Sequence, residues 1–569
     1  MKYFTIKYRN FLFILITFNF SLFTFHCSAQ HWVPDTNKKF SLRMIVGGGQ
    51  GTKLHVYKDT LFLSGSFSWI SDIHAFNIAR YYNGRWDSLR GGIYGEAFAM
   101  QYYNGYLYVG GSFNCVFSRG GPYGTEFYWE QVPHTAGVAK WDGNQWYALD
   151  TTDGCGSFCI MDMQLFNNIL ILGANYWVYG SYGVRGFDGT NWIDIGSLPR
   201  VATLGKFNDK LYAGQTDPAF LAEYQGNGIW DFYALNNYYP MSTGCLLTDT
   251  INNFLYVGGD FIKAGNPPMS SYKTAMWDGF QWHSMGGYFS NCPLKFKIYR
   301  GYLHAATNFD TLLNGEGINC IGRWDWDTFR WYPLGSGLKG GYNGSYACDL
   351  EVFHDTLFVT GSFSLAGGDS AIGLARWYAP PDTNCAFLRP MIHTLALQDT
   401  FYLSQGHAQV QFFNNNSYAQ SWYWDFGDGG TSYTKDPIHT YTDTGTYNVR
   451  VSVTHKMIDD TTRTCTKIAT KTIVVLHNNE IDTYTEESLN FKIYPNPTTG
   501  DFIVECTLPI DKIGLIKAFN SYGSFLEEFQ LESGCNHLVI PSSQWITHII
   551  LCGLYIDGKQ ILVEKVVKN

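Results

Sequence analysis

Charged residues are scarce in this chain of 569 residues. Lysine, arginine, aspartate and glutamate together make up 15% of the sequence, against about 25% in an ordinary soluble protein. The 39 basic and 48 acidic residues give a formal net charge of −9. The chain therefore lacks the basic surplus typical of nucleic-acid-binding proteins, and we expect no nucleic acid among its partners.

The sequence also lacks the short motifs of several enzymes and metal proteins. It contains no phosphate-binding GxxxxGK[ST] loop, no HExxH motif, no EF-hand loop and no GxSxG nucleophile elbow. No two cysteines have CxxC spacing, which argues against a zinc ribbon or a thioredoxin-like redox site. The 15 histidines are scattered along the chain. We therefore predict no catalytic residue, no metal site and no cofactor.

Aromatic residues and glycine, in contrast, are abundant. The chain has 18 Trp, 40 Tyr, 41 Phe and 60 Gly. Disordered chains carry few aromatic residues, and long helices carry few glycines. The composition therefore favours short β-strands joined by tight turns, and the length suggests roughly three to four domains.

The N-terminus has the pattern of a secretory signal peptide over residues 1–29. Basic residues open it, a mostly apolar stretch follows over 11–25, and Cys27-Ser28-Ala29 offers small residues for cleavage. A membrane anchor is one alternative, but the stretch is short for a span of about 20 residues. A lipoprotein attached through Cys27 is another, but the residues before it are not small. No later segment is long and apolar enough to span a membrane, so we expect none in the mature chain.

Cleavage leaves an even number of cysteines, which permits disulfides in an exported protein. Cys155 and Cys159 are close enough in sequence to pair within one loop. Cys385 and Cys465 flank a later segment that a disulfide would close. These are the two candidate pairs, although sequence alone does not fix the pairing.

Seven copies of one pattern follow the signal peptide. The first half is a turn and an apolar strand ending in glycine, as in Asn104-Gly-Tyr-Leu-Tyr-Val-Gly-Gly111. The second half is a strand, an Asn-Gly or Asp-Gly turn and a tryptophan, as in Ala139-Lys-Trp-Asp-Gly-Asn-Gln-Trp146. The anchor leucines lie 41 to 63 residues apart, at Leu61, Leu107, Leu170, Leu211, Leu255, Leu303 and Leu357. Such a period with four strands per copy is typical of a β-propeller, and seven anchors predict seven blades.

The seventh copy stops at residue 378, without its last strand. Phe40-Ser-Leu-Arg43 resembles Trp86-Asp-Ser-Leu-Arg90 of the first copy. We therefore predict that residues near 37–46 supply the outer strand of the last blade, which would remove an exposed sheet edge. The region 30–379 resembles the kelch and galactose-oxidase-like propellers, and this resemblance implies a fold but not a function.

Residues 386–476, after a linker at 380–385, resemble a PKD domain, which implies an immunoglobulin-like sandwich. The resemblance rests on the turn motif Trp424, Asp425, Phe426, Gly427, Asp428 and Gly429 and on the strands after it. We interpret Asp425 and Asp428 as acceptors for turn amides and His439 as a packed side chain. An acid/base pair or a metal site is the alternative for the two aspartates.

Residues 490–569, after a polar linker at 477–489, resemble the type A sorting domain of the Bacteroidetes type IX secretion system. The resemblance rests on a terminal hairpin and on the motif Tyr494, Pro495, Asn496, Pro497 and Gly500. It implies the type IX machinery as a partner and export through the outer membrane, followed by release or surface attachment. The alternative is a further adhesive sandwich.

Candidate ligand-binding residues lie where the chain departs from the repeat. The longest insertion contains Tyr123, Phe127, Tyr128, Trp129 and Glu130. Aromatic loops of this kind suit glycan or peptide contacts, although the loop could instead cover a hydrophobic blade surface. We interpret the repeated Trp-Asp-Gly elements as packing between blades.

Together these patterns predict an all-β chain: a seven-bladed β-propeller, a PKD sandwich and a small C-terminal sandwich. We predict a secreted or cell-surface, non-catalytic binding or adhesion protein, with a glycan or protein ligand and the PKD domain as a spacer. One alternative is an extracellular carbohydrate-active enzyme or a copper oxidase of the galactose-oxidase kind. The oxidase requires a Cys–Tyr pair and two histidines on the axis, and the sequence reveals no such set. A purely structural surface component is the third possibility.

Overall fold

The computed structural model describes most of the chain from residue 30 onward. The described residues are 30–44, 49–119, 130–149, 160–178, 181–215, 220–234, 243–265, 269–286, 289–309, 311–312, 315–341, 344–382, 385–404, 406–457, 461–477, 489–509, 512–520, 525–545, 547–556 and 558–568. Strands and turns dominate these ranges, with short 3-10 turns at η1 (Leu395–Leu397) and η2 (Ser542–Gln544). The prediction of an all-β chain is confirmed. Within the same ranges no helix is long and apolar enough to cross a membrane.

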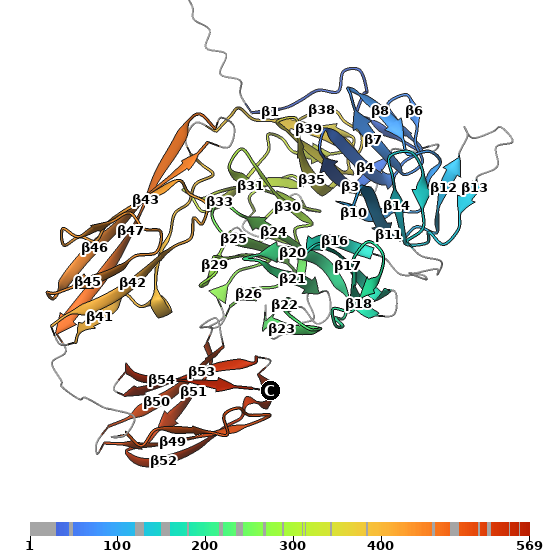
Figure 1. Ribbon diagram of the computed structural model, residues 1–569. Helices are drawn as coiled ribbons and strands as arrows, with labels where there is room; N and C mark the ends of the chain where they lie inside the picture. Colours follow the sequence, from blue (N-terminus) through green and yellow to red (C-terminus); the bar gives the residue numbers. More distant parts are fainter. Residues whose placement is uncertain are drawn as a thin grey trace, which may run out of the picture.

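Seven four-stranded antiparallel sheets follow one another in the described part of residues 31–378 (Figure 1). The first four are β3 (Gln50–Tyr57), β4 (Thr60–Ser66), β7 (Ile78–Tyr82) and β8 (Arg85–Ser88); β10 (Ala97–Tyr103), β11 (Tyr106–Gly111), β14 (Val138–Trp141) and β15 (Trp146–Tyr147); β16 (Ile160–Phe166), β17 (Ile169–Val178), β18 (Ser181–Phe187) and β19 (Trp192–Ile193); and β20 (Val201–Phe207), β21 (Lys210–Gln215), β22 (Phe220–Gly226) and β23 (Ile229–Ala234). The last three are β24 (Thr243–Asp249), β25 (Phe254–Gly259), β28 (Thr274–Trp277) and β29 (Trp282–Ser284); β30 (Lys295–Tyr299), β31 (Tyr302–Ala306), β32 (Ile321–Asp325) and β33 (Arg330–Pro333); and β35 (Tyr346–Phe353), β36 (Thr356–Ser362), β39 (Leu374–Tyr378) and β1 (His31–Trp32).

The first strand of each sheet, which we call the inner strand, contacts the inner strands of the neighbouring sheets. The contacts run in the order β3, β10, β16, β20, β24, β30 and β35, and β35 in turn contacts β3. The order therefore returns to its starting point, and we call this set of sheets the ring. The inner strands turn into the next strand through tight hairpins, such as Asn104-Gly105, whose φ angles of 46° and 85° suit a two-residue turn.

Tryptophans of the repeat tie neighbouring sheets together. The indole Nε1 of Trp146 donates a hydrogen bond of 2.9 Å to Leu89 O, which follows the last strand of the preceding sheet. Trp230 makes the equivalent bond of 2.7 Å to Ile195 O. These rings are also buried, so the periodic aromatic residues combine apolar packing with a specific hydrogen bond between sheets.

The strand that completes the last sheet is β1, and the prediction that residues near 37–46 supply it is wrong. His31 pairs with Tyr378 and Trp32 with Trp377. The physical reason is the tryptophan that each last strand provides, because residues 37–46 contain none. Trp32 lies 5.3 Å from the Trp377 ring and donates to Leu334 O at 2.8 Å. Residues 42 and 43 instead form β2 (Leu42–Arg43), which pairs with β5 (Trp69–Ile70).

Short strands form four further small sheets in the described part of residues 31–378. They form the small sheets of β2, β5 and β6 (Ile73–His74); of β9 (Gly92–Tyr94), β12 (Cys115–Arg119) and β13 (Glu130–Val132); of β26 (Lys263–Ala264) and β27 (Met269–Ser270); and of β34 (Leu338–Lys339), β37 (Leu365–Ala366) and β38 (Asp369–Ser370).

A two-sheet sandwich follows the ring, shown in orange in Figure 1. One sheet contains β40 (Ile392–Thr394), β42 (Ala408–Asn414) and β45 (Ile438–Tyr441); the other contains β41 (Thr400–Leu403), β47 (Thr464–His477), β46 (Gly445–Lys456), β43 (Ser421–Asp425) and β44 (Thr431–Ser432). Trp424 and the valines of β46 are fully buried between the sheets. A disulfide joins Cys385 to Cys465 in β47, with 5.7 Å between their Cα atoms. Cys155 and Cys159 lie outside the described residues.

Asparagines hold this sandwich against the ring, at a contact that we call the joint. Asn252, in the turn between β24 and β25, donates to Phe387 O at 2.7 Å and accepts from Arg389 N at 2.7 Å. Asn415, just after β42, donates to Asn252 O at 2.7 Å. Asn252 is only 3% exposed. The sandwich is therefore fixed to the turn of one sheet by buried polar contacts.

The C-terminal sandwich is drawn in red in Figure 1. One sheet contains β48 (Lys492–Tyr494), β49 (Phe502–Leu508) and β52 (Gly534–Ile540), and the other contains β51 (Phe525–Leu531), β50 (Gly514–Asn520), β53 (Ile549–Ile556) and β54 (Lys559–Val567). Asn496 bridges its two ends, because Nδ2 donates to Lys565 O at 2.7 Å and Oδ1 accepts from Val567 N at 2.9 Å.

Candidate functional site

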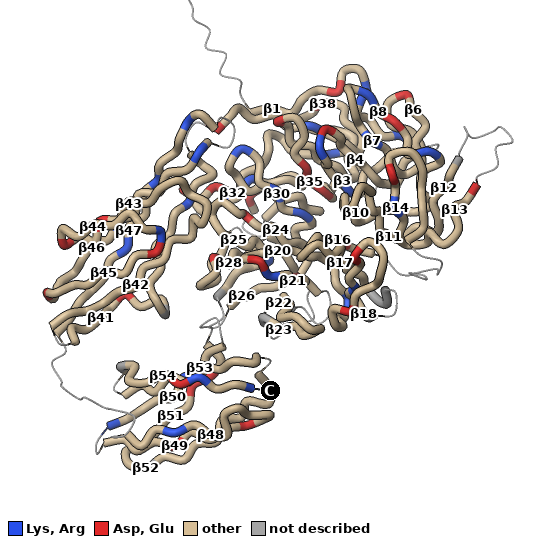
Figure 2. Tube along the Cα trace, viewed as in Figure 1, with Lys and Arg blue, Asp and Glu red and all other residues tan. Residues whose placement is uncertain are grey.

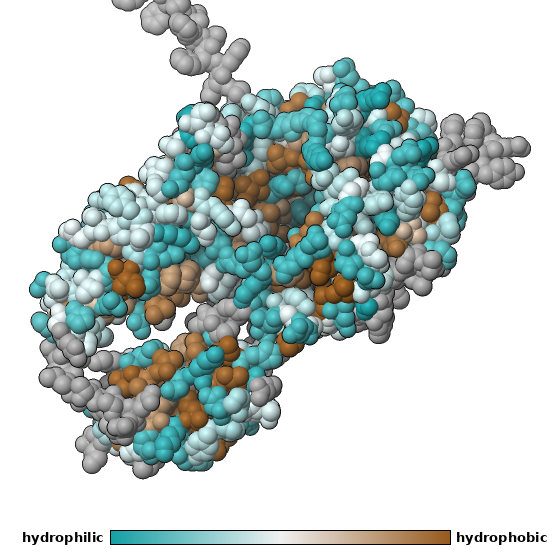
Figure 3. Space-filling model, viewed as in Figure 1, coloured by the Kyte–Doolittle hydropathy of each residue, from teal (hydrophilic) through white to brown (hydrophobic). Residues whose placement is uncertain are grey.

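A cavity of about 390 Å³, which we call the central cavity, lies among the inner strands of the ring and has lining residues from all seven. Figure 2 shows basic and acidic segments close together where β3, β30 and β35 meet, and Figure 3 shows the surface hollowed in the same part of the view. The volume lies within the range of pockets that hold small ligands. The charged residues and the histidine of the lining are Lys53, His55, Asp162, Lys206, Lys295, Lys297 and Glu351.

A shared irregularity of the inner strands places these side chains. In six of the seven described sheets, the pairing of the first two strands shifts by one residue at the same level. Side chains two residues apart in a strand point to the same side. The residue after the shift and the one two further on are Lys53 and His55 in β3 and Asp349 and Glu351 in β35. The pairing of β30 with β31 has no such shift, and there Lys295 and Lys297 pair with Ala306 and His304.

Two aspartates of this region accept hydrogen bonds from backbone amides and, in the case of Asp162, also from a threonine hydroxyl. Asp162 Oδ2 accepts hydrogen bonds from Leu204 N at 2.8 Å and from Thr203 Oγ1 at 3.2 Å. Asp349 Oδ2 accepts from Leu54 N at 2.9 Å. Both aspartates therefore link one inner strand to the next, and the amides partly compensate their charge.

The lysines of the cavity differ in their partners. Lys53 Nζ lies 3.6 Å from Asp349 Oδ2, and Lys297 forms an ion pair with Glu351. Lys295 has no ion-pair partner among the described residues. Burial opposes its charged form, but the more distant carboxylates, Asp349 first, outweigh burial and raise the pKa of Lys295 above its usual range. Lys295 is therefore a charged ammonium without a direct counterion in the described part of the chain.

His55 lines the cavity in its neutral form. Burial, reinforced by the charge of Lys53, lowers the pKa of His55 to about 4. Its Nε2 atom is buried and has no hydrogen-bond partner within the described residues. A buried polar atom without a partner costs free energy, so such an atom calls for an explanation such as a bound ligand or water.

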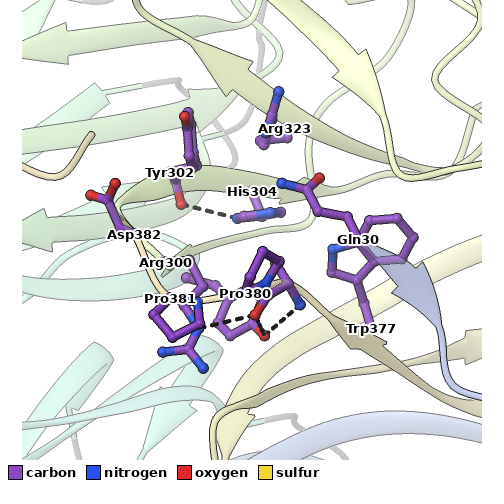
Figure 4. Close-up of a pocket in the computed structure, with 11 residues that line it drawn as sticks. Gln30, Arg300, Tyr302, His304, Arg323, Trp377, Pro380, Pro381 and Asp382 are labelled. Carbon is purple, nitrogen blue, oxygen red and sulfur yellow. Dashed lines mark hydrogen bonds between the residues drawn. The ribbon is translucent and has the colours of Figure 1, made fainter. Parts of the chain in front are cut away.

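A second, smaller pocket of about 150 Å³ lies where the ring meets the segment that leads to the next sandwich (Figure 4). Its strongest groups are engaged with each other: the Arg323 guanidinium lies 4.4 Å from the centre of the Tyr302 ring, and His304 Nδ1 lies 3.0 Å from Tyr302 O. Arg300 Nε donates to Ala379 O at 3.2 Å. Burial lowers the pKa of His304 to about 3. These contacts join the ring to the segment that follows it and occupy polar groups of this pocket. The central cavity is therefore the better candidate site.

Of the ligand-binding residues predicted from sequence, the structure describes Glu130 alone, which is not among the lining residues of the central cavity. Tyr123, Phe127, Tyr128 and Trp129 lie outside the described residues. Glu130 opens β13 and is exposed in a small sheet beside the ring. Sequence reasoning missed the residues of the cavity, although Asp162 and Asp349 interrupt the mostly apolar strands β16 and β35. That interruption is the signal that points to them.

Asp425 and Asp428, in the turn motif of the second sandwich, accept hydrogen bonds from turn amides, as interpreted from the sequence. Asp425 Oδ1 accepts from Gly427 N at 3.0 Å, and Asp428 Oδ1 accepts from Gly430 N at 2.9 Å. His439 Nε2 lies 2.7 Å from Asp428 Oδ2, and its ring stacks on Phe426. Burial raises the pKa of Asp428, but bonds from His439 and Gly430 outweigh it and lower the pKa below its usual value.

Trp141, in one of the Trp-Asp-Gly elements, is 3% exposed and faces Trp146 across the strand pair. It belongs to an apolar cluster that includes Phe62 and Ile78 of the preceding sheet, so it packs between sheets as well. Among the described residues, no group of three His, Cys, Asp or Glu side chains is arranged to hold a metal ion.

Comparison with known families identifies one part of the chain. The PKD domain family matches residues 403–473, within the second sandwich, so the chain contains a PKD domain. No curated protein matches the chain.

Several solved structures are similar to the chain at low identity. The computationally designed Ika8 protein is 14% identical, with 60% of this chain and 100% of that protein covered and a TM-score of 0.34. The extracellular domain of the putative one component system BT4673 from B. thetaiotaomicron is 9% identical, with 94% and 100% covered and a TM-score of 0.26. PorZ, a surface component of the type IX secretion system of Porphyromonas gingivalis, is 12% identical, with 91% and 75% covered and a TM-score of 0.26. At these scores the similarity carries no conclusion about this chain.

Proposed function

We propose that the chain is an extracellular or cell-surface binding protein whose ring is a seven-bladed β-propeller and whose ligand site is the central cavity. The single observation that carries this proposal is a cavity lined from all seven inner strands. His55, whose Nε2 has no hydrogen-bond partner among the described residues, belongs to that lining. The cyclic order of contacts between the inner strands supports the propeller. The last sheet has four strands like the others because β1 completes it, and this also supports the propeller.

The PKD domain has a more specific part in this proposal than that of a loose spacer. Buried bonds of Asn252 and Asn415 fix it to the turn between β24 and β25, next to the disulfide at Cys385. In the proposed arrangement it holds the ring at a set orientation on the cell surface. The C-terminal sandwich acts as the type IX sorting domain, and the exposed residues Tyr494 to Pro497 are available to the secretion machinery.

A cavity-filling variant tests the binding function. The full chain is screened on a glycan array and by thermal shift with small ligands, beside Gln164→Trp, which fills the cavity, and Gln409→Trp, which places the same side chain on an exposed strand of the PKD domain. We expect Gln409→Trp to bind like the unchanged chain and Gln164→Trp to lose binding. Binding that survives in Gln164→Trp while that variant stays folded would place the ligand elsewhere.

Deletion of residues 490–569 tests the sorting function in the native host. We expect the shortened chain to remain in the periplasm. Its appearance in the medium at the level of the full chain would contradict the assignment.

A further inference from the structure

We infer that Cys245 and Cys292 are joined by a disulfide that links the fifth sheet of the ring to the sixth. The inference rests on the proposed extracellular location, because disulfides persist in oxidising compartments. It does not depend on the proposed ligand site. The pair is also separate from the two candidate pairs of the sequence, since its members belong to different copies of the repeat.

The positions of the two sulfur atoms are the first support. Cys245 is buried in β24, and Cys292 lies three residues before β30, the inner strand of the next sheet. Pro293 O lies 3.5 Å from Cys245 Sγ and 3.2 Å from Cys292 Sγ. The sulfurs are therefore no further apart than these two distances placed end to end. A change of rotamer moves a cysteine sulfur by about 3 Å, so rotation of the two side chains can close the gap to a bond.

The glycines beside the pair are the second support. A Cβ atom added at Gly244 would lie 2.4 Å from Cys292 Sγ, and one added at Gly258 would lie 2.7 Å from Cys245 Sγ. Gly258 is the residue of β25 that pairs with Cys245. The sulfurs thus occupy space that a side chain at either glycine would fill. The two glycines leave room for both sulfur atoms between the same two sheets.

The chemistry of the chain is the third support. It already contains one disulfide, between Cys385 and Cys465, so the thiols of this chain meet an oxidant. Within the described ranges, neither Cys245 nor Cys292 belongs to a group of side chains that could hold a metal ion. A crosslink is therefore the use that fits two thiols facing one carbonyl oxygen.

The oxidant in this inference is the protein disulfide of a thiol–disulfide oxidoreductase. The thiolate of one cysteine attacks that disulfide, forms a mixed disulfide and releases one thiolate of the oxidoreductase. The thiolate of the other cysteine then attacks the mixed disulfide, forms the Cys245–Cys292 bond and releases the second thiolate. Two electrons pass to the oxidoreductase, whose two thiolates take up the two protons that the cysteines lose.

The crosslink forms while the ring is still folding. Burial raises the pKa of the Cys292 thiol to about 12 and raises the pKa of Cys245 well above its usual value. The reactive thiolates are therefore scarce once the sheets have packed. After formation the bond holds β24 and β30 together beside the central cavity, because Leu246, Leu247 and Lys295 line that cavity.

Peptide mapping of the full chain, purified from its native host, tests the inference. The chain is unfolded in urea with N-ethylmaleimide and without reductant, and is then digested with trypsin. Cleavage after Lys263 and Lys273 separates the two cysteines, so that peptide 211–263 contains Cys245 and peptide 274–295 contains Cys292. We expect both peptides in one species, two hydrogens lighter than their sum, which reduction splits.

Two variants accompany the unchanged chain. Cys245→Ala should leave Cys292 open to N-ethylmaleimide. Cys115→Ala, which removes another buried cysteine in β12, is the matched control and should leave the two peptides linked. The mapping of the unchanged chain decides the inference even if a variant folds poorly.

The outcomes separate this inference from the proposed location. N-ethylmaleimide on Cys245 and Cys292, with Cys385 still linked to Cys465, overturns the inference and leaves the extracellular location standing. Linkage of Cys245 or Cys292 to a different cysteine overturns the inference in the same way. N-ethylmaleimide on all four cysteines overturns the inference and contradicts the extracellular location as well.

Discussion

Two buried polar regions of this chain differ in what their side chains do. At the joint, Asn252 uses both atoms of its side-chain amide and its own carbonyl to hold the segment that enters the PKD domain. In the central cavity, His55 Nε2 has no partner among the described residues, and Lys295 has no ion pair there. A polar group that is matched within the protein stabilises one arrangement, whereas an unmatched one reduces stability unless a ligand completes it.

The contrast is one of degree. Asn416 Oδ1 and Arg389 Nε, both at the joint, also lack partners among the described residues. Yet Asn416 Nδ2 donates to Ile251 O at 3.0 Å and to Asn252 Oδ1 at 3.1 Å, so the side chain is held even where one atom is unmatched. The joint is therefore interpreted as structural and the cavity as a binding site, and four experiments test that division.

The largest expected effect comes from the disulfide beside the joint. Cys385 and Cys465 are 80 residues apart in sequence, and closing a loop of that length stabilises by about 4 kcal/mol in the chain-entropy view. The double variant Cys385→Ala, Cys465→Ala should lower the free energy of unfolding of the PKD domain by an amount of that order, measured by urea denaturation. Cys552→Ala, a buried unpaired cysteine in the C-terminal sandwich, is the control. Equal losses in both variants would mean that the crosslink adds nothing beyond packing.

The next effect is a pH dependence that originates in the cavity. The pKa of His55 is about 4 in the folded chain and 6.5 for an unperturbed histidine. As pH falls from about 6.5 toward 4, His55 binds a proton in the unfolded chain but stays neutral in the folded chain. The free energy of unfolding therefore decreases over that interval. The loss reaches about 3 kcal/mol for a shift of this size.

His55→Phe should remove this part of the pH slope, which equilibrium denaturation between pH 7 and pH 4 would measure. His304, whose pKa is lowered to about 3 by burial, contributes a similar slope of its own and remains in both chains. An unchanged slope in His55→Phe would show that the imidazole is solvated and that the cavity is not the source.

The joint itself should respond to loss of Asn252. Asn252→Ala leaves Phe387 O and Arg389 N without their partners and should weaken the joint by about 2 kcal/mol. Hydrogen exchange of the peptide around residues 386–391 measures this directly, and about thirtyfold faster exchange is expected. Asn448→Ala, on an exposed position of β46, is the matched control. Unchanged exchange in Asn252→Ala would mean that the joint does not depend on these bonds.

The sequence alone predicts the strands and hairpins of the ring. It predicts neither the strand that completes the last sheet nor the central cavity. Aromatic and glycine periodicity predicted the hairpins, because tight turns and alternating side chains leave local patterns. The strand β1 was missed because its only mark is Trp32, more than 300 residues from its partner Trp377. The central cavity was missed for the same reason: Lys53 and Asp349 become neighbours only when the first and last sheets meet. Contacts between distant segments leave no local pattern, whereas the PKD turn motif is local and was recognised.

The smallest expected effect gives the sharpest contrast between the two regions. At pH 7.5 His55 is neutral and its Nε2 is unmatched, so His55→Phe removes a buried polar atom without removing a hydrogen bond at that nitrogen. The free energy of unfolding should change by no more than about 1 kcal/mol, and in either direction, since the ring is of similar size. Asn252→Ala, which breaks matched bonds, should cost more in the same buffer. If His55→Phe destabilised the chain more than Asn252→Ala, the imidazole would have to be a structural element of the ring, and the division between joint and cavity would fail.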